Sequence, residues 1–188
     1  MRQQISARMI ELIKGVLRNH RLAAFVIFDF VWLAAVLGRG EWLWVTALLI
    51  LGMFAATPKL LWRQRQTLFF LVVLGCLAEF ATVYFGVIRY EGSALIPMWL
   101  ILLWVGFSGM ALIVFDYLHR RYLVAAILGA IFGPITYFAG ERLGAAEILV
   151  PYFTAVVVYS IFWAVIMVII ARFAIPATAN KAVNEPSR

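Results

Sequence analysis

Two acidic residues lie inside long apolar runs, and they are the side chains best placed to do chemistry. Glu79 lies near the middle of the run at residues 67–88, and Asp29 lies midway along the run at residues 22–38. An acid at membrane depth costs about 2.5 to 3.5 kcal/mol on insertion scales, so it usually has a partner or a task. Neither run contains a Lys or Arg, so burial favours the neutral, proton-donating carboxyl. We expect Glu79 and Asp29 to bind a proton or a substrate, or to act as general acids.

A structural interpretation of the same two acids stays open. Each could simply donate a hydrogen bond to a neighbouring helix, a contact that contributes about 1 kcal/mol. The polar side chains that could accept it from other apolar runs are Ser108, Thr136, Tyr137 and Thr154. Of these, we include Tyr137 with Glu79 and Asp29 as a candidate proton- or substrate-binding residue.

Missing motifs narrow the enzyme hypotheses. His20 and His119 are the only histidines, which is too few for a histidine-rich di-iron centre. There is no H-E-x-x-H, no G-x-S-x-G and no phosphate-binding glycine loop. Asp116 and His119 are one helical turn apart, but two residues do not make a metal site. The thiol of Cys76 should resist ionisation in an apolar span. We therefore predict no metal and no cofactor, name no catalytic residue, and leave open whether the protein is an enzyme.

The elements that would carry these acids are membrane-spanning helices. Hydrophobic residues make up 65% of the 188 residues and charged residues only 13%, a composition typical of membrane proteins. This length allows about six spans of roughly 20 residues and no separate soluble domain. The fold class is all-α, with an amphipathic interfacial helix at residues 1–21, a bundle at 22–171 and a polar cytoplasmic tail at 172–188. The six spans are expected near residues 22–38, 42–57, 67–88, 95–115, 122–139 and 148–171.

The basic residues predict the orientation of these spans. Thirteen of the 16 Lys and Arg residues lie in the amino terminus, the tail and the two linkers on the same side. The positive-inside rule places that side, and both termini, in the cytoplasm. The net charge of +7 then reflects contact with anionic lipid headgroups. Membrane lipids are the expected partners, and nucleic acid is not.

The fifth span carries a pattern of small residues that is typical of close helix packing. Its glycines recur at intervals of four, seven and four residues, at Gly129, Gly133, Gly140 and Gly144. Pro134 lies among them and could kink the span, which would free the carbonyl of Ala130 to line a cavity. A substrate pocket is the alternative interpretation of this pattern. Packing between copies through this span is a route to oligomers that stays open.

Residues 96–145 carry a recognisable pattern. It contains PMWLILLWVGFS and, further on, RRYLVAAILGAIFGPITYFAGERLGA. The combination of P-x-W, L-W, GA-x-x-GP-x-x-Y-x-x-G and LGA resembles domain-of-unknown-function family 2878 of bacteria. The resemblance implies a small, multi-pass protein of the bacterial inner membrane, in a context of lipid metabolism. It implies no activity.

Two functions are therefore expected from different classes. The first is a binding or accessory component of membrane-lipid metabolism, with a lipid-modifying enzyme as a potential partner. The second is a proton-linked transporter of a small or lipidic substrate that uses the intramembrane carboxyls. An integral membrane enzyme ranks third, because the chain offers acids but no recognisable nucleophile.

Overall fold

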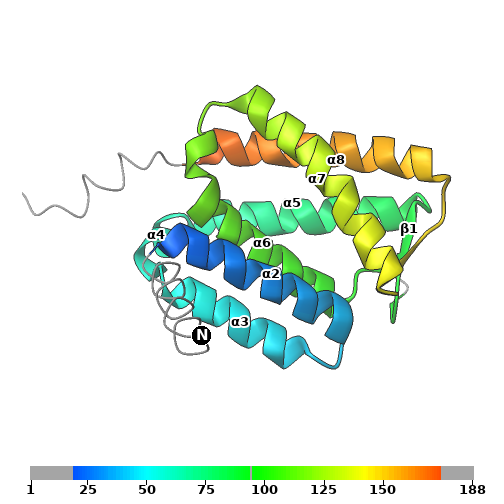
Figure 1. Ribbon diagram of the computed structural model, residues 1–188, viewed down its shortest axis with the longest axis horizontal. Coiled ribbons are helices and arrows are strands. Elements are labelled where there is room, and N and C mark those ends of the chain that lie inside the picture. Colours follow the sequence, from blue (N-terminus) through cyan, green and yellow to red (C-terminus); the bar gives the residue numbers. More distant parts are fainter. Residues whose placement is uncertain (1–18, 94, 175–188) are drawn as a thin grey trace, which may run out of the picture.

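The computed structural model describes residues 19–93 and 95–174. The predicted interfacial helix at residues 1–21 and the predicted tail at 172–188 lie almost entirely outside this part of the chain. The described residues form a bundle of seven helices, one 3-10 turn and two short strands (Figure 1). In chain order these are α2 (His20–Gly38), α3 (Leu43–Ala55), α4 (Pro58–Arg63), α5 (Arg65–Tyr84), β1 (Ile88–Tyr90), α6 (Met98–Val114), η1 (Phe115–Leu118), α7 (Tyr122–Arg142), β2 (Ala146–Ile148) and α8 (Tyr152–Phe173).

Five of these helices are long and apolar enough to cross a membrane. They are α2, α5, α6 continued through η1, α7 and α8. The predicted second span is represented by α3, which has only 13 residues. At a rise of 1.5 Å per residue it extends about 20 Å, short of the roughly 30 Å hydrocarbon core. The prediction of a multi-pass helical protein agrees with this structure, while the six-span count and the orientation stay predictions.

Local sequence explains where several helices begin. The side chain of Asn19 accepts hydrogen bonds from the backbone N–H groups of Arg21 and Leu22, which caps the start of α2. Pro58 occupies the first turn of α4, where its missing N–H has no intrahelical partner to lose. Pro97 immediately precedes α6. The amino-terminal cap therefore places α2 two residues earlier than the hydropathy of the chain predicts.

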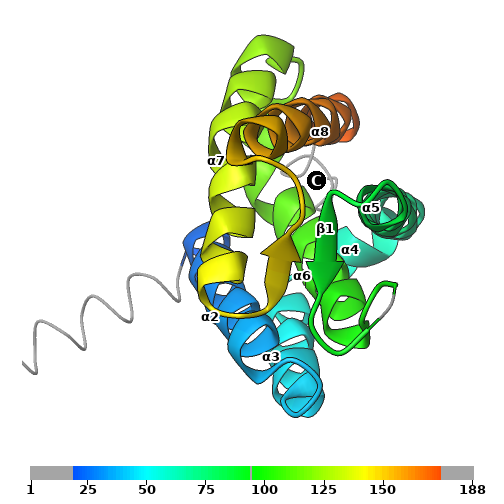
Figure 2. The same ribbon diagram turned by 90° about the vertical axis from the view of Figure 1, so that its right-hand side faces the viewer.

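The helices form two groups that enclose the core. Helix α7 packs along α8, while α2 packs against α3 and α6, and α5 packs against α6. Seen from the strand end, α7 and α8 lie on one side and α2 and α3 on the opposite side, with the strands crossing between them (Figure 2). Between the two groups, the largest contiguous core contains Trp99, Trp104, Tyr137 and Tyr159.

The two strands form an antiparallel ribbon that the sequence analysis did not predict. β1 pairs with β2 in the register Ile88 with Ile148, Arg89 with Glu147 and Tyr90 with Ala146. Ile88 and Tyr90 are buried while Arg89 is exposed, as the alternation of a strand requires. Arg89 forms an ion pair with Glu147 across the ribbon. The ribbon therefore turns Tyr90 inward, toward the helices.

The opposite end of the bundle is joined by polar contacts. Arg21, in the first turn of α2, forms an ion pair with the buried Asp116 of η1. His119 Nδ1 lies 2.7 Å from the carbonyl oxygen of Ala174, just beyond α8. The sequence spacing of Asp116 and His119 therefore reflects two separate contacts, one to α2 and one to the end of α8.

The glycines of α7 have different surroundings. A Cβ at Gly129 would lie 2.3 Å from the backbone oxygen of Trp163, and one at Gly133 would lie 2.3 Å from Cγ of the same residue. These two glycines let α8 approach closely. Gly140 has open space at its Cβ position, and Gly144 lies in the following turn at φ 73°. The packing role predicted from the spacing therefore does not extend to Gly140 and Gly144.

Pro134 frees the carbonyl of Ala130, as expected, but that carbonyl accepts a hydrogen bond from α8 instead of lining a cavity. Pro134 lies inside α7 and cannot donate to the oxygen of Ala130. Ser160 of α8 donates its hydroxyl to that oxygen at 2.8 Å. The freed carbonyl thus joins α7 to α8, and Ala130 is not among the residues that line the cavity described below.

Candidate functional site

Glu79 lies in the second half of α5 and is only 2% exposed. Its carboxyl group receives three hydrogen bonds from side chains. The hydroxyl of Tyr90 donates to Oε2 at 2.5 Å, the hydroxyl of Tyr137 donates to Oε1 at 2.6 Å, and Nε1 of Trp104 donates to Oε1 at 3.3 Å. Glu79 therefore has the partners that a buried acid requires.

Four separate elements bring these groups together. Glu79 is on α5, Tyr90 on β1, Trp104 on α6 and Tyr137 on α7. Gly75 lies one turn before Glu79, and a Cβ there would lie 2.1 Å from Cε3 of Trp104. The absence of a side chain at Gly75 therefore lets the indole reach Glu79.

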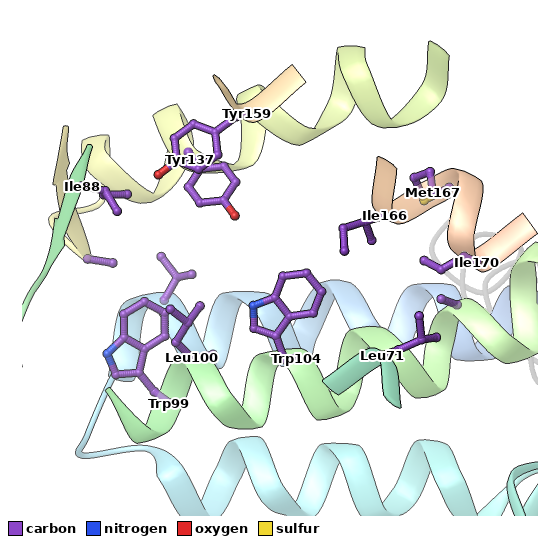
Figure 3. Packing of buried hydrophobic residues seen from close by; sticks show 14 of the residues in the cluster. Leu71, Ile88, Trp99, Leu100, Trp104, Tyr137, Tyr159, Ile166, Met167 and Ile170 are labelled. Atoms are coloured by element: carbon purple, nitrogen blue, oxygen red, sulfur yellow. The ribbon is translucent and has the colours of Figure 1, made fainter. Parts of the chain in front are cut away.

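Stacking holds Tyr137 in place. Its ring lies on that of Tyr159 from α8, with centroids 3.5 Å apart and an interplanar angle of 15°. Figure 3 shows this pair across the core from Trp99, Leu100 and Trp104. On the other side of the carboxyl, Tyr90 packs edge-on against Trp99 at 5.8 Å. Both phenols that contact Glu79 are thus oriented by a second aromatic ring.

All three donors to Glu79 are neutral. No Lys, Arg or His of the described residues contacts its carboxyl group. Burial raises the pKa of the Tyr90 phenol well above its ordinary value of 10.0, and the charge of Glu79 raises it further. Tyr90 therefore keeps its proton and acts as a donor. A carboxyl between two phenols can hold a proton or receive a hydrogen bond from a ligand.

A cavity of about 490 Å³ adjoins this cluster. Glu79, Tyr90, Trp104 and Tyr137 all contribute to its wall, and most of the remaining lining is apolar. Its volume falls within the range of pockets that hold small organic ligands. The carboxyl cluster thus forms one polar part of an otherwise apolar chamber.

Asp29 lines the same cavity but is exposed, in contrast to Glu79. Its carboxyl has no hydrogen-bond partner among the described residues, and it does not contact Glu79. The two acids are therefore joined by a shared cavity rather than by a direct hydrogen bond. Of the four polar residues considered as their partners, Tyr137 alone bonds to either acid in the described part of the chain.

The cavity reaches the surface between α2 and α7. Several of its lining residues are themselves exposed, among them Phe25 and Asp29 of α2 and Phe132 and Thr136 of α7. Asp29 and Phe132 lie near the middle of their helices, His20–Gly38 and Tyr122–Arg142. The opening, which we call the lateral mouth and define by these four residues, is therefore at mid-height of two candidate spans.

Sequence reasoning missed Tyr90 and Trp104. Tyr90 follows Arg89 in a polar stretch that reads as a turn, and Trp104 is one of several aromatic residues in an apolar helix. Neither sequence context distinguishes a hydrogen-bond donor to Glu79 from an interfacial or packing residue. The available signal was chemical: tyrosine and tryptophan carry the donors that a buried carboxyl needs.

These features define a class of protein: a multi-pass helical bundle with a carboxyl-containing cavity that opens at mid-span. The chain belongs to the family described as "Protein of unknown function (DUF2878)", which matches residues 21–169. This confirms the resemblance and extends it well beyond residues 96–145. No curated protein and no solved structure matches the chain.

Proposed function

We propose that the protein binds a lipidic ligand that enters the cavity sideways from the bilayer, as a binding or accessory component of membrane-lipid metabolism in the bacterial inner membrane. The observation that supports this most directly is the lateral mouth. Phe132, at this opening, is 60% exposed and belongs to a helix long enough to span a membrane. An opening at that height faces hydrocarbon rather than water.

The walls of the cavity suit the same kind of ligand. Apolar side chains such as Leu100, Leu103 and Met110 supply much of the lining. An alkyl chain gains about 0.8 kcal/mol for each CH₂ group it buries from water, but much less on transfer from lipid. Affinity over bulk lipid must then come from shape and from the polar residues Glu79 and Asp29.

Fluorescence quenching tests this proposal. The protein is reconstituted into nanodiscs of unbrominated lipid, with the exposed Trp42, Trp44 and Trp62 replaced by Phe to remove background. A brominated single-chain alcohol is then added. We expect it to quench the tryptophans that line the cavity, with saturation at a low mole fraction in the membrane. Quenching that rises linearly, without saturation, would contradict a binding site.

A pair of adjacent variants locates the binding. Thr136→Phe adds a ring at the lateral mouth and should weaken saturable quenching severalfold. Ile135→Phe adds a ring at the preceding residue, which is exposed but does not line the cavity, and should leave quenching unchanged. Equal effects of both variants would place the probe elsewhere.

The second candidate function is proton-linked transport. It is favoured by Glu79, which is buried beside the cavity and accepts hydrogen bonds from two phenols, because ionisable residues inside a membrane often mark proton pathways. Transport predicts flux of a lipidic amphiphile into proteoliposomes that responds to a proton gradient and is lost in Glu79→Gln. Saturable binding without flux would support the binding function and contradict the transport function.

An accessory role also predicts a protein partner. We expect a lipid-modifying enzyme to co-purify with the protein, and deletion of the protein to change the lipid composition of the cell. Comparing lipidomes with and without the protein measures the second effect. An unchanged lipidome under several growth conditions would argue against a place in lipid metabolism.

A further inference from the structure

The charge of the cavity restricts the ligands that it can hold. Among the described residues that line it, Asp29 and Glu79 are acidic, and there is no Lys, Arg or His. An anionic headgroup such as a phosphate or a carboxylate would meet negative charge or neutral donors, without a compensating cation. Burying an uncompensated anion beside acidic groups is strongly unfavourable. The cavity therefore selects against anionic amphiphiles.

The aromatic lining favours the opposite charge. Twelve of the 26 residues that line the cavity are aromatic, so a ligand in the cavity would contact aromatic side chains. Trp104 and Trp163 stack at 5.5 Å, and Phe107 packs edge-on against Trp163 at 4.9 Å. The faces of such rings attract ammonium groups, and aromatic cages are the usual sites for quaternary ammonium ligands.

Asp29 supplies the charge partner. It is exposed at the lateral mouth, midway along α2, and no described residue bonds to its carboxyl. A lone acid at that depth is unfavourable unless something compensates it. An ammonium group in the cavity would provide that compensation while its alkyl chain contacts the apolar wall.

We infer that the ligand is a single-chain amphiphile with a cationic ammonium head, held by Asp29 and by the aromatic walls of the cavity. This inference rests on the proposed ligand-binding function and names the chemical class of the ligand. Glu79 is more deeply buried than Asp29, and its carboxyl accepts hydrogen bonds from Tyr90 and Tyr137.

Three probes with the same alkyl chain test the inference. An alkyltrimethylammonium, an alkyl alcohol and an alkyl carboxylate each compete with the brominated alcohol in nanodiscs of zwitterionic lipid, and are compared at equal mole fraction in the membrane. We expect the ammonium to bind about tenfold more tightly than the alcohol, and the carboxylate to bind most weakly. Equal affinities for ammonium and alcohol would overturn the inference and leave the binding function intact. Failure of every probe would overturn both.

Matched variants assign the preference to Asp29. Asp29→Asn removes the charge and keeps the shape, and should reduce the preference for ammonium over alcohol to about threefold or less. Glu91→Gln removes the same charge at an exposed position that does not line the cavity, and should keep the full preference. The circular dichroism spectrum and the thermal unfolding of Asp29→Asn, measured in parallel, show that the variant protein is folded. An unchanged preference in Asp29→Asn would contradict the role of Asp29.

Discussion

At the scale of single residues, the three hydrogen bonds to the buried carboxyl of Glu79 should contribute to the stability of the fold. Replacing Tyr90 with Phe keeps the ring that packs against Trp99 but removes the hydroxyl that donates to Oε2. We expect Tyr90→Phe to lower the free energy of unfolding by about 1 to 2 kcal/mol, because a buried acceptor loses one partner. Denaturant titration in detergent micelles measures this difference.

Tyr84→Phe provides the matched control for that experiment. Tyr84 is 73% exposed at the end of α5, and its hydroxyl has no hydrogen-bond partner in the described structure. Its replacement should change stability by less than about 0.5 kcal/mol. Equal losses from the two variants would show that the bond to Glu79 adds nothing.

The phenol of Tyr90 also predicts a pH dependence. In the unfolded chain a tyrosine loses its proton near pH 10, whereas burial raises the pKa of Tyr90 in the folded protein. The folded state therefore holds more protons above about pH 10, and its stability falls as pH rises. The stability difference between the parent and Tyr90→Phe should shrink above about pH 10. A constant difference up to pH 11 would contradict this assignment.

Some residues of the candidate site could be predicted from the sequence, and others could not. Glu79 could be identified from sequence because an acid in an apolar run stands out, and Tyr137 because it is a polar residue in another run. Their pairing joins residues 58 positions apart, and Tyr90 reaches Glu79 from a different element altogether. Such contacts depend on how helices pack, which hydropathy does not encode.

At the scale of elements, the contact between α7 and α8 depends on two glycines. Gly129→Ala would place a methyl group 2.3 Å from the backbone oxygen of Trp163, so one helix must move. We expect a loss of about 1 to 3 kcal/mol in the free energy of unfolding. Gly140→Ala, which meets open space in the same helix, should be neutral or stabilising by up to about 1 kcal/mol. Similar stability losses from the two variants would mean that close packing against α8 does not cause the loss in Gly129→Ala.

Element boundaries were predictable where sequence signals were local. Glycine and proline positions, with hydropathy, placed the long helices to within a few residues. The ribbon was not predictable, because strands of three residues are too short to show an alternating pattern. It depends instead on the pairing of residues 88–90 with 146–148, which are far apart in the chain.

At the scale of the whole molecule, the sides of the membrane on which the two termini lie show whether the chain crosses it an even or an odd number of times. Six spans place both termini on the same side, whereas five place them on opposite sides. The distribution of Lys and Arg predicts that both are cytoplasmic. Reporter fusions at each end, one active only in the cytoplasm and one only outside it, measure this directly. Termini on opposite sides would mean that α3 does not cross.

The register of the ribbon determines which side chain of β1 faces the interior and which faces the surface. Neighbouring positions along a strand face opposite directions, so sliding β1 by one residue would turn the phenol of Tyr90 outward and bring Arg89 in. Glu79 would then exchange a neutral donor for a guanidinium. An insertion or deletion in the connection between α5 and β1 that slid the strand by one residue would therefore change the charge balance of the acid without altering any helix.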